Sequence, residues 1–416
     1  MRARAAQLVV GGALIGLLAA CVSPPPPVPS QTPAATAHPT GDGVLRVGTL
    51  FPSTGASAFI GPAQAAGVAV AIEEINAAGG VGGVPVERVV RDSGDASTGT
   101  VEASFAELDA AGVDVVIGPS SSVLAQRVIP LAAEARTTVI SPAATFPLLT
   151  SIPDSGYFFR TIPGYGTQGR ALGELLRDAG RVGLLYIDDD FGRALAPELK
   201  AGLDDNGGTL AIAQSIPVGT TDLAPAIAAL VKAAPDVVVL GSTYGSVDAT
   251  KALLLATIAA GYGGAKLWLT SQNTGDYSQS LPNGTLAGVG GIIEGFQPDE
   301  AFVARLKAVD PALGSVRYAV EAYDATILAA LAAVVARDEA GEAIASTLTD
   351  VSRGGIKCTS FAECLQALKT QDDIDYDGLS GPLNFTPEGD ISPVFYGIYS
   401  YDGENRFVFG RGIVAG

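Results

Sequence analysis

Short, mainly apolar runs alternate with longer helical patterns along most of the chain. This alternation predicts parallel β-sheets built from βα units. The pattern is interrupted at GYFFRTIPGYGTQG, over residues 156–169, and then starts again. The predicted strands of the first series begin at Val44, Val84, Val113 and Thr137, and those of the second begin at Arg181, Thr209, Pro235 and Ala265.

The repeated pattern divides the mature chain into two similar α/β halves. We predict an α/β fold of two Rossmann-like lobes with parallel sheets, joined by a hinge of several strands. Lobe 1 is expected over residues 44–162 and about 291–394, and lobe 2 over residues 163–290 and about 395–416. The mature length of about 370 residues exceeds what one hydrophobic core usually supports. With 48% hydrophobic residues, the chain can fill two cores.

The first 43 residues carry export signals rather than a core. The apolar run over residues 8–20 follows basic residues and is shorter than the ~20 residues of a membrane-spanning helix, which predicts a signal peptide over residues 1–20. The run ends in Leu18-Ala19-Ala20-Cys21, which resembles the bacterial lipobox and predicts a lipid on Cys21. An ordinary signal peptide with an incidental cysteine is the alternative. Residues 21–43 are rich in proline and are expected to form a tether.

Composition argues against several classes of function. A net charge of −18 without a basic cluster argues against nucleic acid as a partner. Three serines at residues 120–122 follow a predicted strand as a hydrolase nucleophile would, but the single histidine, His38, lies in the proline-rich segment, so a Ser-His-Asp triad is excluded. His38 and three scattered cysteines offer no metal-ligand spacing, and no phosphate-binding loop of the G-x-x-x-x-G-K-[ST] type occurs. We therefore expect no enzyme activity, no cofactor and no metal.

Two cysteines, Cys358 and Cys364, remain once Cys21 is assigned to a lipid. Six residues along one helix would separate their Cα atoms by ~9 Å, which is too far for the ~4.4 to 6.8 Å of a disulfide. Residues 360–363 form a capping-box pattern, which would begin the helix at Phe361 and leave Cys358 in the preceding turn. A disulfide is then feasible, and the exported compartment permits it.

Ligands of parallel α/β sheets bind beyond the carboxyl ends of the strands, where helix N-termini converge. In the first half this rule selects the loops FPSTGASAFIG, GPSSSV and SPAATFP, which contain hydroxyl groups and small residues but no charged side chain. Such loops suit an anion, typically a carboxylate, held by neutral donors. We expect Ser122 and Thr145 to contact it, with the backbone N–H groups of Ala143 and Thr145 as further donors. The alternative is that Ser122 and Thr145 only cap their helices.

The matching loops of the second half are DDDFGRA, GSTYGSV and TSQNTGD. They differ from the first set in offering aromatic, amide and acidic side chains that would cover the rest of a small ligand. For Phe191 the alternative is that it packs beneath the lobe and does not contact the ligand. The side chains selected here are the aromatic Phe191 and Tyr244, the amides Gln272 and Asn273, and the acids Asp188, Asp189, Asp190 and Asp276.

Seven motifs, taken together with the signal and the tether, resemble the Leu/Ile/Val-type (branched-chain amino-acid) periplasmic substrate-binding proteins of ABC transporters, in their lipoprotein form. The resemblance covers nearly all of residues 44–416. It implies the type I periplasmic binding protein fold. The motifs are VGTLFPSTGASAFIG, AIEEINAAGGVGG, VVIGPSSSV, VISPAAT, YFFRTIPGYGTQGRAL, LLYIDDDFG and GPLNFTPEGD.

The resemblance also implies site residues. In the family the ligand's carboxylate and amine are held by the loops that match SSS and SPAAT, and aromatic contacts come from the second lobe. The acid that usually binds the amino group is replaced here by Gln272 or Asn273, or by Tyr165 in the first crossing. This departure leaves room for amides, ureas, and aromatic or aliphatic acids. The implied ligand-binding residues are Ser122, Ala143, Ala144, Thr145, Tyr165, Phe191, Thr243, Tyr244, Gln272 and Asn273.

These features predict a solute-binding lipoprotein, anchored outside the cytoplasm through Cys21, that delivers a small ligand to the permease of an ABC importer. We expect it to act as a monomer. The alternative is a sensory receptor of the same fold that docks to a membrane signalling protein.

Overall fold

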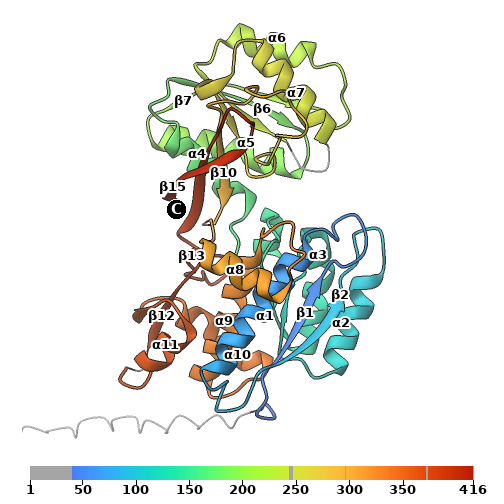
Figure 1. The fold of residues 1–416 in the computed structure, drawn as a ribbon, viewed down its shortest axis with the longest axis vertical. Helices are drawn as coiled ribbons and strands as arrows, with labels where there is room; N and C mark the ends of the chain where they lie inside the picture. The colour runs from blue at the N-terminus through green and yellow to red at the C-terminus, as the bar shows by residue number, and fades with distance from the viewer. Residues whose placement is uncertain (1–39, 243–246, 296, 372, 416) are drawn as a thin grey trace, which may run out of the picture. The chain divides into compact units, whose positions relative to one another are not determined.

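The computed structural model describes residues 40–242, 247–295, 297–371 and 373–415. They form an α/β structure with two main sheets, and each sheet is the centre of one lobe (Figure 1). The sheet of lobe 1 has the order β2-β1-β3-β4-β5, and all of its pairs are parallel. Its strands are β1 (Arg46–Phe51), β2 (Glu87–Asp92), β3 (Val115–Ile117), β4 (Thr138–Ser141) and β5 (Phe158–Arg160).

Helices cover both faces of this sheet, which is why β3 and β4 are buried at every residue. Among the described residues one helix, α9 (Ala319–Ala336), is long and apolar enough to cross a membrane, but 83% of it is buried, as expected of a core helix. The helices of lobe 1 are α1 (Gly61–Ala77), α2 (Thr100–Ala110), α3 (Ser122–Ala135), the 3-10 helix η1 (Pro147–Ser151), α8 (Glu300–Val309), α9 (Ala319–Ala336), α10 (Gly341–Val351) and α11 (Phe361–Ala367).

A small third sheet lies beside α10 and α11 and consists of β11 (Ile356–Cys358), β12 (Ile374–Gly378) and β13 (Gly381–Pro382). A disulfide joins Cys358 to Cys364, with 5.2 Å between the Cα atoms. Helix α11 begins at Phe361 because the Ser360 side chain accepts a hydrogen bond from the backbone N–H of Glu363. The Glu363 carboxylate in turn accepts one from the N–H of Thr359. Cys358 therefore precedes the helix and can reach Cys364.

The sheet of lobe 2 has the order β15-β14-β10-β9-β8-β6-β7. Strands β6 to β10 pair in parallel, whereas β14 and β15 add antiparallel pairs, so this sheet is mixed. The strands are β6 (Arg181–Ile187), β7 (Thr209–Ile216), β8 (Val237–Gly241), β9 (Leu267–Leu269), β10 (Gly290–Glu294), β14 (Val394–Tyr401) and β15 (Phe407–Ala415). The helices are α4 (Tyr165–Leu175), α5 (Asp190–Asp205), α6 (Ala224–Ala233), α7 (Val247–Ala259) and the 3-10 helix η3 (Gly264–Lys266).

Glycines set the distance between α4 and α5, which pack closely. A Cβ atom on Gly173 would lie 2.5 Å from the carbonyl carbon of Gly202, and one on Gly169 would lie 2.7 Å from the carbonyl oxygen of Leu195. Larger residues would therefore push the helices apart. This packing matters for the site because α4 begins at Tyr165 and α5 begins beside Phe191.

The chain passes between the two main sheets after β5, after β10 and before β14. Arg160 ends the last strand of the first sheet, and Tyr165 begins the first helix of lobe 2. Glu294 ends β10 in the second sheet, and α8 follows it in lobe 1. The lobe boundaries at about residues 162, 291 and 395 stay a prediction; strand β10 continues to Glu294 within the sheet of lobe 2.

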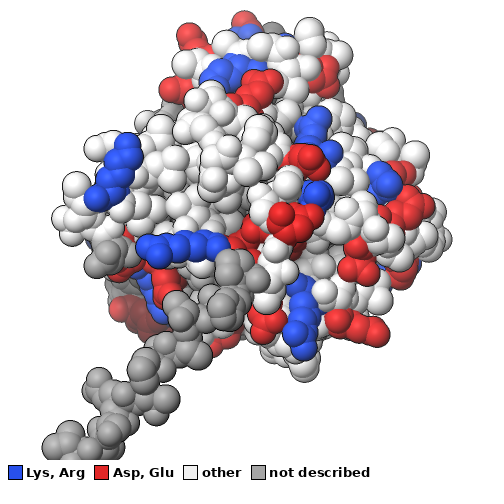
Figure 2. All heavy atoms as spheres, turned by 90° about the horizontal axis from the view of Figure 1, so that it is seen from below, with Lys and Arg blue, Asp and Glu red and all other residues white. Residues whose placement is uncertain are grey.

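Surface charge does not gather into one patch on the face shown in Figure 2, where basic and acidic side chains are interspersed. Many of the basic side chains pair with acids; the exposed pair Arg136–Glu342, at 3.3 Å, is one example. Isolated pairs of this kind contribute little to stability.

Candidate ligand-binding site

A cleft of about 880 Å³ receives side chains from both lobes. In lobe 1 its lining comes from the loops that follow β1, β2, β3 and β4 and from the segment before α9. Tyr165 and Gln272 reach it from lobe 2. Of the residues predicted to bind a ligand, the cleft brings together Ser122, Ala143, Thr145, Tyr165 and Gln272.

The three serines at residues 120–122 have different hydrogen-bond partners. Ser120 donates to the Gln64 side chain at 2.8 Å, and Ser121 is the N-cap of α3 because its side chain accepts from the N–H of Leu124. Ser122 is therefore the first residue of α3 and not its cap, contrary to the alternative raised from the sequence.

The Ser122 hydroxyl is buried and accepts hydrogen bonds from the backbone N–H groups of Thr145, at 2.9 Å, and Phe146, at 3.1 Å. A hydroxyl has two acceptor sites and one donor. Both acceptor sites are used within the protein, so the O–H is the group that remains for a ligand. A group that can only donate suits an oxygen acceptor such as a carboxylate.

The backbone of the loop after β4 is held in place by hydrogen bonds within the protein. The N–H groups of Ala143 and Ala144 point to the Ser141 hydroxyl, at 3.5 and 3.0 Å, while the carbonyl of Thr145 accepts from the N–H of Tyr165 at 2.9 Å. The N–H groups of Ala143 and Thr145, proposed from the sequence as ligand donors, are thus bonded inside the protein. Ala144 is fully buried among core residues and does not line the cleft.

Aromatic rings stack beneath one wall of the cleft. The ring of Tyr165 lies 5.9 Å from that of Phe146 and 4.8 Å, edge-on, from that of Phe191. Phe191 is only 1% exposed and does not line the cleft, so it supports Tyr165 as part of the core. Burial raises the pKa of Tyr165 well above its usual range, which keeps its phenol protonated at neutral pH.

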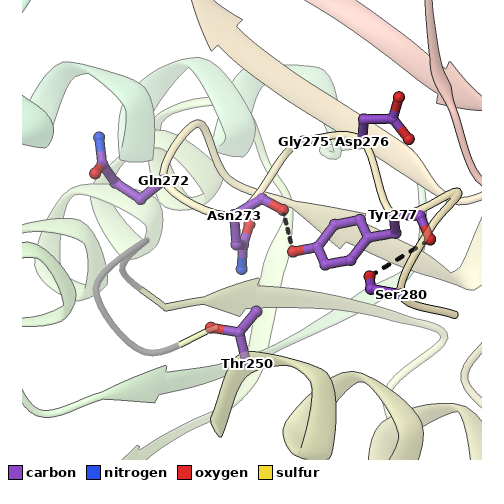
Figure 3. A pocket seen from close by; sticks show the side chains of 7 residues that line it. All are labelled: Thr250, Gln272, Asn273, Gly275, Asp276, Tyr277 and Ser280. Atoms are coloured by element: carbon purple, nitrogen blue, oxygen red, sulfur yellow. Dashed lines mark hydrogen bonds between the residues drawn. The ribbon is translucent and has the colours of Figure 1, made fainter. Parts of the chain in front are cut away.

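Gln272 and Asn273 have different surroundings. Asn273 is buried and fully bonded: its amide donates to the carbonyl of Leu240 and to Ser242, and its carbonyl accepts from Thr270. It also lines a small hollow of about 70 Å³, in which its backbone carbonyl accepts from the Tyr277 hydroxyl (Figure 3). Gln272 lines both that hollow and the cleft, and its side chain points away from Asn273 and Tyr277.

Three residues that were predicted to be functional, Thr243, Tyr244 and Cys21, lie outside the described residues.

Arg317 and Tyr318 also line the cleft and were not predicted. Among the described residues that line the cleft, Arg317 is the only one with a basic side chain. Its guanidinium donates to the carbonyl of Ser271 in lobe 2, at 3.3 Å, and lies 4.9 Å from the ring centre of Tyr318. Tyr318 has φ 64°, a left-handed conformation that is strained for a bulky residue and is often found at functional sites.

Among the described residues, Asp95 is the one acid that lines the cleft. It accepts hydrogen bonds from Ser97 of its own loop and from the N–H of Ala56 in the loop after β1. The cleft thus offers a guanidinium and neutral hydroxyl donors toward a ligand. These groups suit an anionic group on a ligand with apolar or aromatic parts.

Comparison with known proteins gives three kinds of match. A family model described as periplasmic binding protein matches residues 44–390. A leucine-, isoleucine-, valine-, threonine-, and alanine-binding protein of Pseudomonas aeruginosa is 30% identical over 206 residues, which cover 48% of this chain and 54% of that protein. Glutamate receptor 2.2 of Arabidopsis thaliana is 27% identical over 338 residues, 76% of this chain and 35% of that receptor. The chain spans about half the length, or less, of these curated relatives.

Solved structures share the fold. The branched-chain amino acid transporter substrate binding protein LivJ from Streptococcus pneumoniae, in complex with isoleucine, has a TM-score of 0.64 at 21% identity, covering 89% of this chain and 99% of that one. A solute binding protein from R. palustris in complex with benzoate has a TM-score of 0.62 at 18% identity, covering 90% and 98%. At these identities the likeness supports the fold alone.

Proposed function

Because the chain belongs to the periplasmic binding protein family, we propose that it is the solute-binding lipoprotein of an ABC importer and closes two lobes over a small carboxylate-bearing ligand. Family membership makes it a binding protein located outside the cytoplasm, not an enzyme. The observation that carries the proposal is the cleft, in which Ser122 and Arg317 of lobe 1 face a volume that Tyr165 and Gln272 of lobe 2 also line.

The proposed ligand is an amino acid of the branched-chain type or a related amide or organic acid. Support for the amino acid comes from the names of the curated relatives and of the isoleucine complex. Support for an organic acid comes from Gln272, a neutral amide at the position where the family usually has an acid, and from the benzoate complex of a structural neighbour.

Lobe closure would follow from contacts that a ligand makes with both lobes at once. A ligand shifts a conformational equilibrium only by its difference in affinity between the two states. In this cleft the difference would come from adding Tyr165 and Gln272 to the contacts of Ser122 and Arg317. The closed form, acting as a monomer, would then be the one that docks to the permease.

A sensory receptor is the second candidate, favoured by the match to a plant glutamate receptor over 76% of this chain. Deleting the gene separates the two. Loss of ligand uptake in the deletion strain supports transport, whereas normal uptake with a lost response to the ligand supports sensing.

A thermal-shift screen of amino acids, organic acids and amides tests the ligand class. A carboxylate at ~100 times its dissociation constant should stabilise the protein by ~2.7 kcal/mol. Amide analogues of the same compounds serve as controls. If only compounds without a carboxylate stabilise the protein, the ligand class is wrong.

Lipidation is tested at Cys21. Replacement by alanine should abolish incorporation of an alkyne-labelled fatty acid and release the protein from the membrane fraction, because the thiol is the proposed attachment point. Ser23→Ala, two residues away, should leave both unchanged. Equal labelling of Cys21→Ala and the wild type would contradict the lipid anchor.

A further inference from the structure

A second cavity, of about 500 Å³, lies next to the cleft and shares Ser315, Arg317 and Tyr318 with it. Its other walls come from the end of β10, the start of α9, and β14 and β15 of lobe 2. Two buried acids, Glu294 and Glu321, and two further aromatic residues, Tyr399 and Phe407, line it. None of the functions argued above uses this cavity.

Glu294 is 7% exposed and has an incomplete set of partners. Its Oε1 accepts hydrogen bonds from the Ser271 hydroxyl and, at 3.3 Å, from the Gln168 amide. Its Oε2 is buried and has no hydrogen-bond partner among the described residues. A buried carboxylate oxygen without a partner carries a large desolvation penalty, which a bound donor or cation would relieve.

Glu321 is also buried, at 6% exposure, and lines the same cavity. It lies against the backbone at Gly295, where a Cβ atom would be only 2.6 Å from Oε1 of Glu321. Gly295 has φ 76°, so both its conformation and the space beside it favour glycine. The chain thus leaves room for a second carboxyl group next to the first.

The aromatic walls are held in place by their neighbours. The ring of Tyr399 lies 5.4 Å, edge-on, from that of Phe407, and the Tyr399 hydroxyl donates to the Gln297 side chain at 3.2 Å. Among the described residues, the other charged side chains that line the cavity are those of Arg317, which lies over Tyr318, and of the exposed Lys307 and Asp276. The buried part of the lining therefore combines two carboxyl groups with aromatic rings.

Carboxylates and aromatic faces are the groups that recognise ammonium ions, through charge and through cation–π attraction. We propose that the second cavity binds a small organic ammonium ion between Glu294, Glu321 and the rings of Tyr318 and Tyr399. This site adjoins the cleft and shares Tyr318 with it, but choline binding is proposed to occur without a ligand in the cleft.

Choline is the probe, because its charge does not titrate, and 3,3-dimethylbutan-1-ol is its neutral analogue of the same shape. Isothermal titration of the full chain in buffer of fixed ionic strength should show choline binding and no binding of the alcohol. At pH 8.5, above the pKa of Glu321, Glu294→Gln and Glu321→Gln should each weaken choline about tenfold or more, because a contact with a charged group is lost while the shape is kept. The matched control is Glu134→Gln, at an exposed acid on α3.

The pH dependence gives an independent readout. The pKa of Glu321 is raised to about 8, chiefly by burial; the nearby Asp324 of α9 and Glu294 of β10 contribute to the rise, and Arg317 opposes it. Tyr318 and Tyr399 also face this carboxyl group and stay protonated, since burial raises the pKa of both. A cation prefers the ionised acid, so choline should bind several-fold more tightly at pH 8.5 than at pH 6.5. Glu321→Gln should remove this difference.

Three outcomes overturn the proposal: no binding of choline, equal binding of the neutral alcohol, or full affinity in both glutamine variants. Should Glu294→Gln fail to fold, Glu321→Gln and its pH profile decide alone. If choline does not bind, the proposed function of the cleft is not affected, because the titration contains no cleft ligand.

Discussion

Replacing Arg160 by methionine should lower the free energy of unfolding by about 3 to 5 kcal/mol, as expected when one partner of a buried ion pair is removed. Arg160 is 2% exposed and pairs with Asp390, far along the chain. Its guanidinium also donates to the carbonyls of Ala144 and Phe146 and to the Thr150 hydroxyl. Methionine keeps much of the volume but leaves these acceptors without a donor. Denaturant unfolding of the ligand-free protein measures the loss.

The matched control is Arg136→Met. Arg136 pairs with Glu342 on the surface, where the two side chains are 70% and 63% exposed, so its loss should cost about 1 kcal/mol or less. An equal loss of unfolding free energy in the two variants would show that the buried hydrogen bonds of Arg160 stabilise the protein no more than a surface ion pair does.

Arg160→Met should also weaken binding in the cleft. Arg160 holds the carbonyls on both sides of Thr145, so its loss loosens the loop that Ser122 contacts. Titration of the folded variant with the identified ligand tests this role. Unchanged affinity would mean that other contacts suffice to fix the loop.

The fold could be predicted because most of its helices and strands follow from patterns of neighbouring residues. The alternation of apolar runs with helical segments gave the βα order. The predicted α/β fold of two lobes is confirmed, with sheets that are rich in parallel pairs. The family resemblance, based on short motifs, is also confirmed by the match over residues 44–390. Ser360 begins α11 as its capping box indicates, since the cap depends only on residues within one turn. The antiparallel pairing of β14 with β10, which lies far earlier in the chain, makes the second sheet mixed, and no local pattern encodes this pairing.

The site was only partly predictable, because its contacts join residues far apart in the sequence. The rule that ligands bind beyond strand ends selected the loops of Ser122 and Thr145, both of which line the cleft. It missed Arg317 and Tyr318, which follow a helix rather than a strand. It also could not show that the Ser122 hydroxyl accepts from the Thr145 N–H, 23 residues away. The sequence signal that could have indicated a site here was Arg317, a lone arginine just before the apolar helix α9.

Ser122→Ala is the most direct test of the cleft. If the Ser122 O–H donates to a ligand carboxylate, the bond is worth ~1.5 to 3 kcal/mol, and its loss should weaken binding roughly ten- to a hundred-fold. The same change leaves the buried N–H groups of Thr145 and Phe146 without their acceptor, so the free energy of unfolding should also fall, by about 1 to 3 kcal/mol.

Two comparisons separate a ligand contact from a structural one. Asp299→Ala removes the N-cap of α8 in the same lobe, outside the cleft, and should cost about 1 kcal/mol of stability while affinity stays unchanged. An amide analogue of the ligand should be less sensitive to Ser122→Ala than the carboxylate, because the charge that strengthens the hydrogen bond is gone. Calorimetric titration gives the affinities, and denaturant unfolding gives the stabilities. If Ser122→Ala weakens the acid and the amide equally, its hydroxyl acts only by joining the loops after β3 and β4, and the carboxylate must be held by Arg317 and other donors of the cleft.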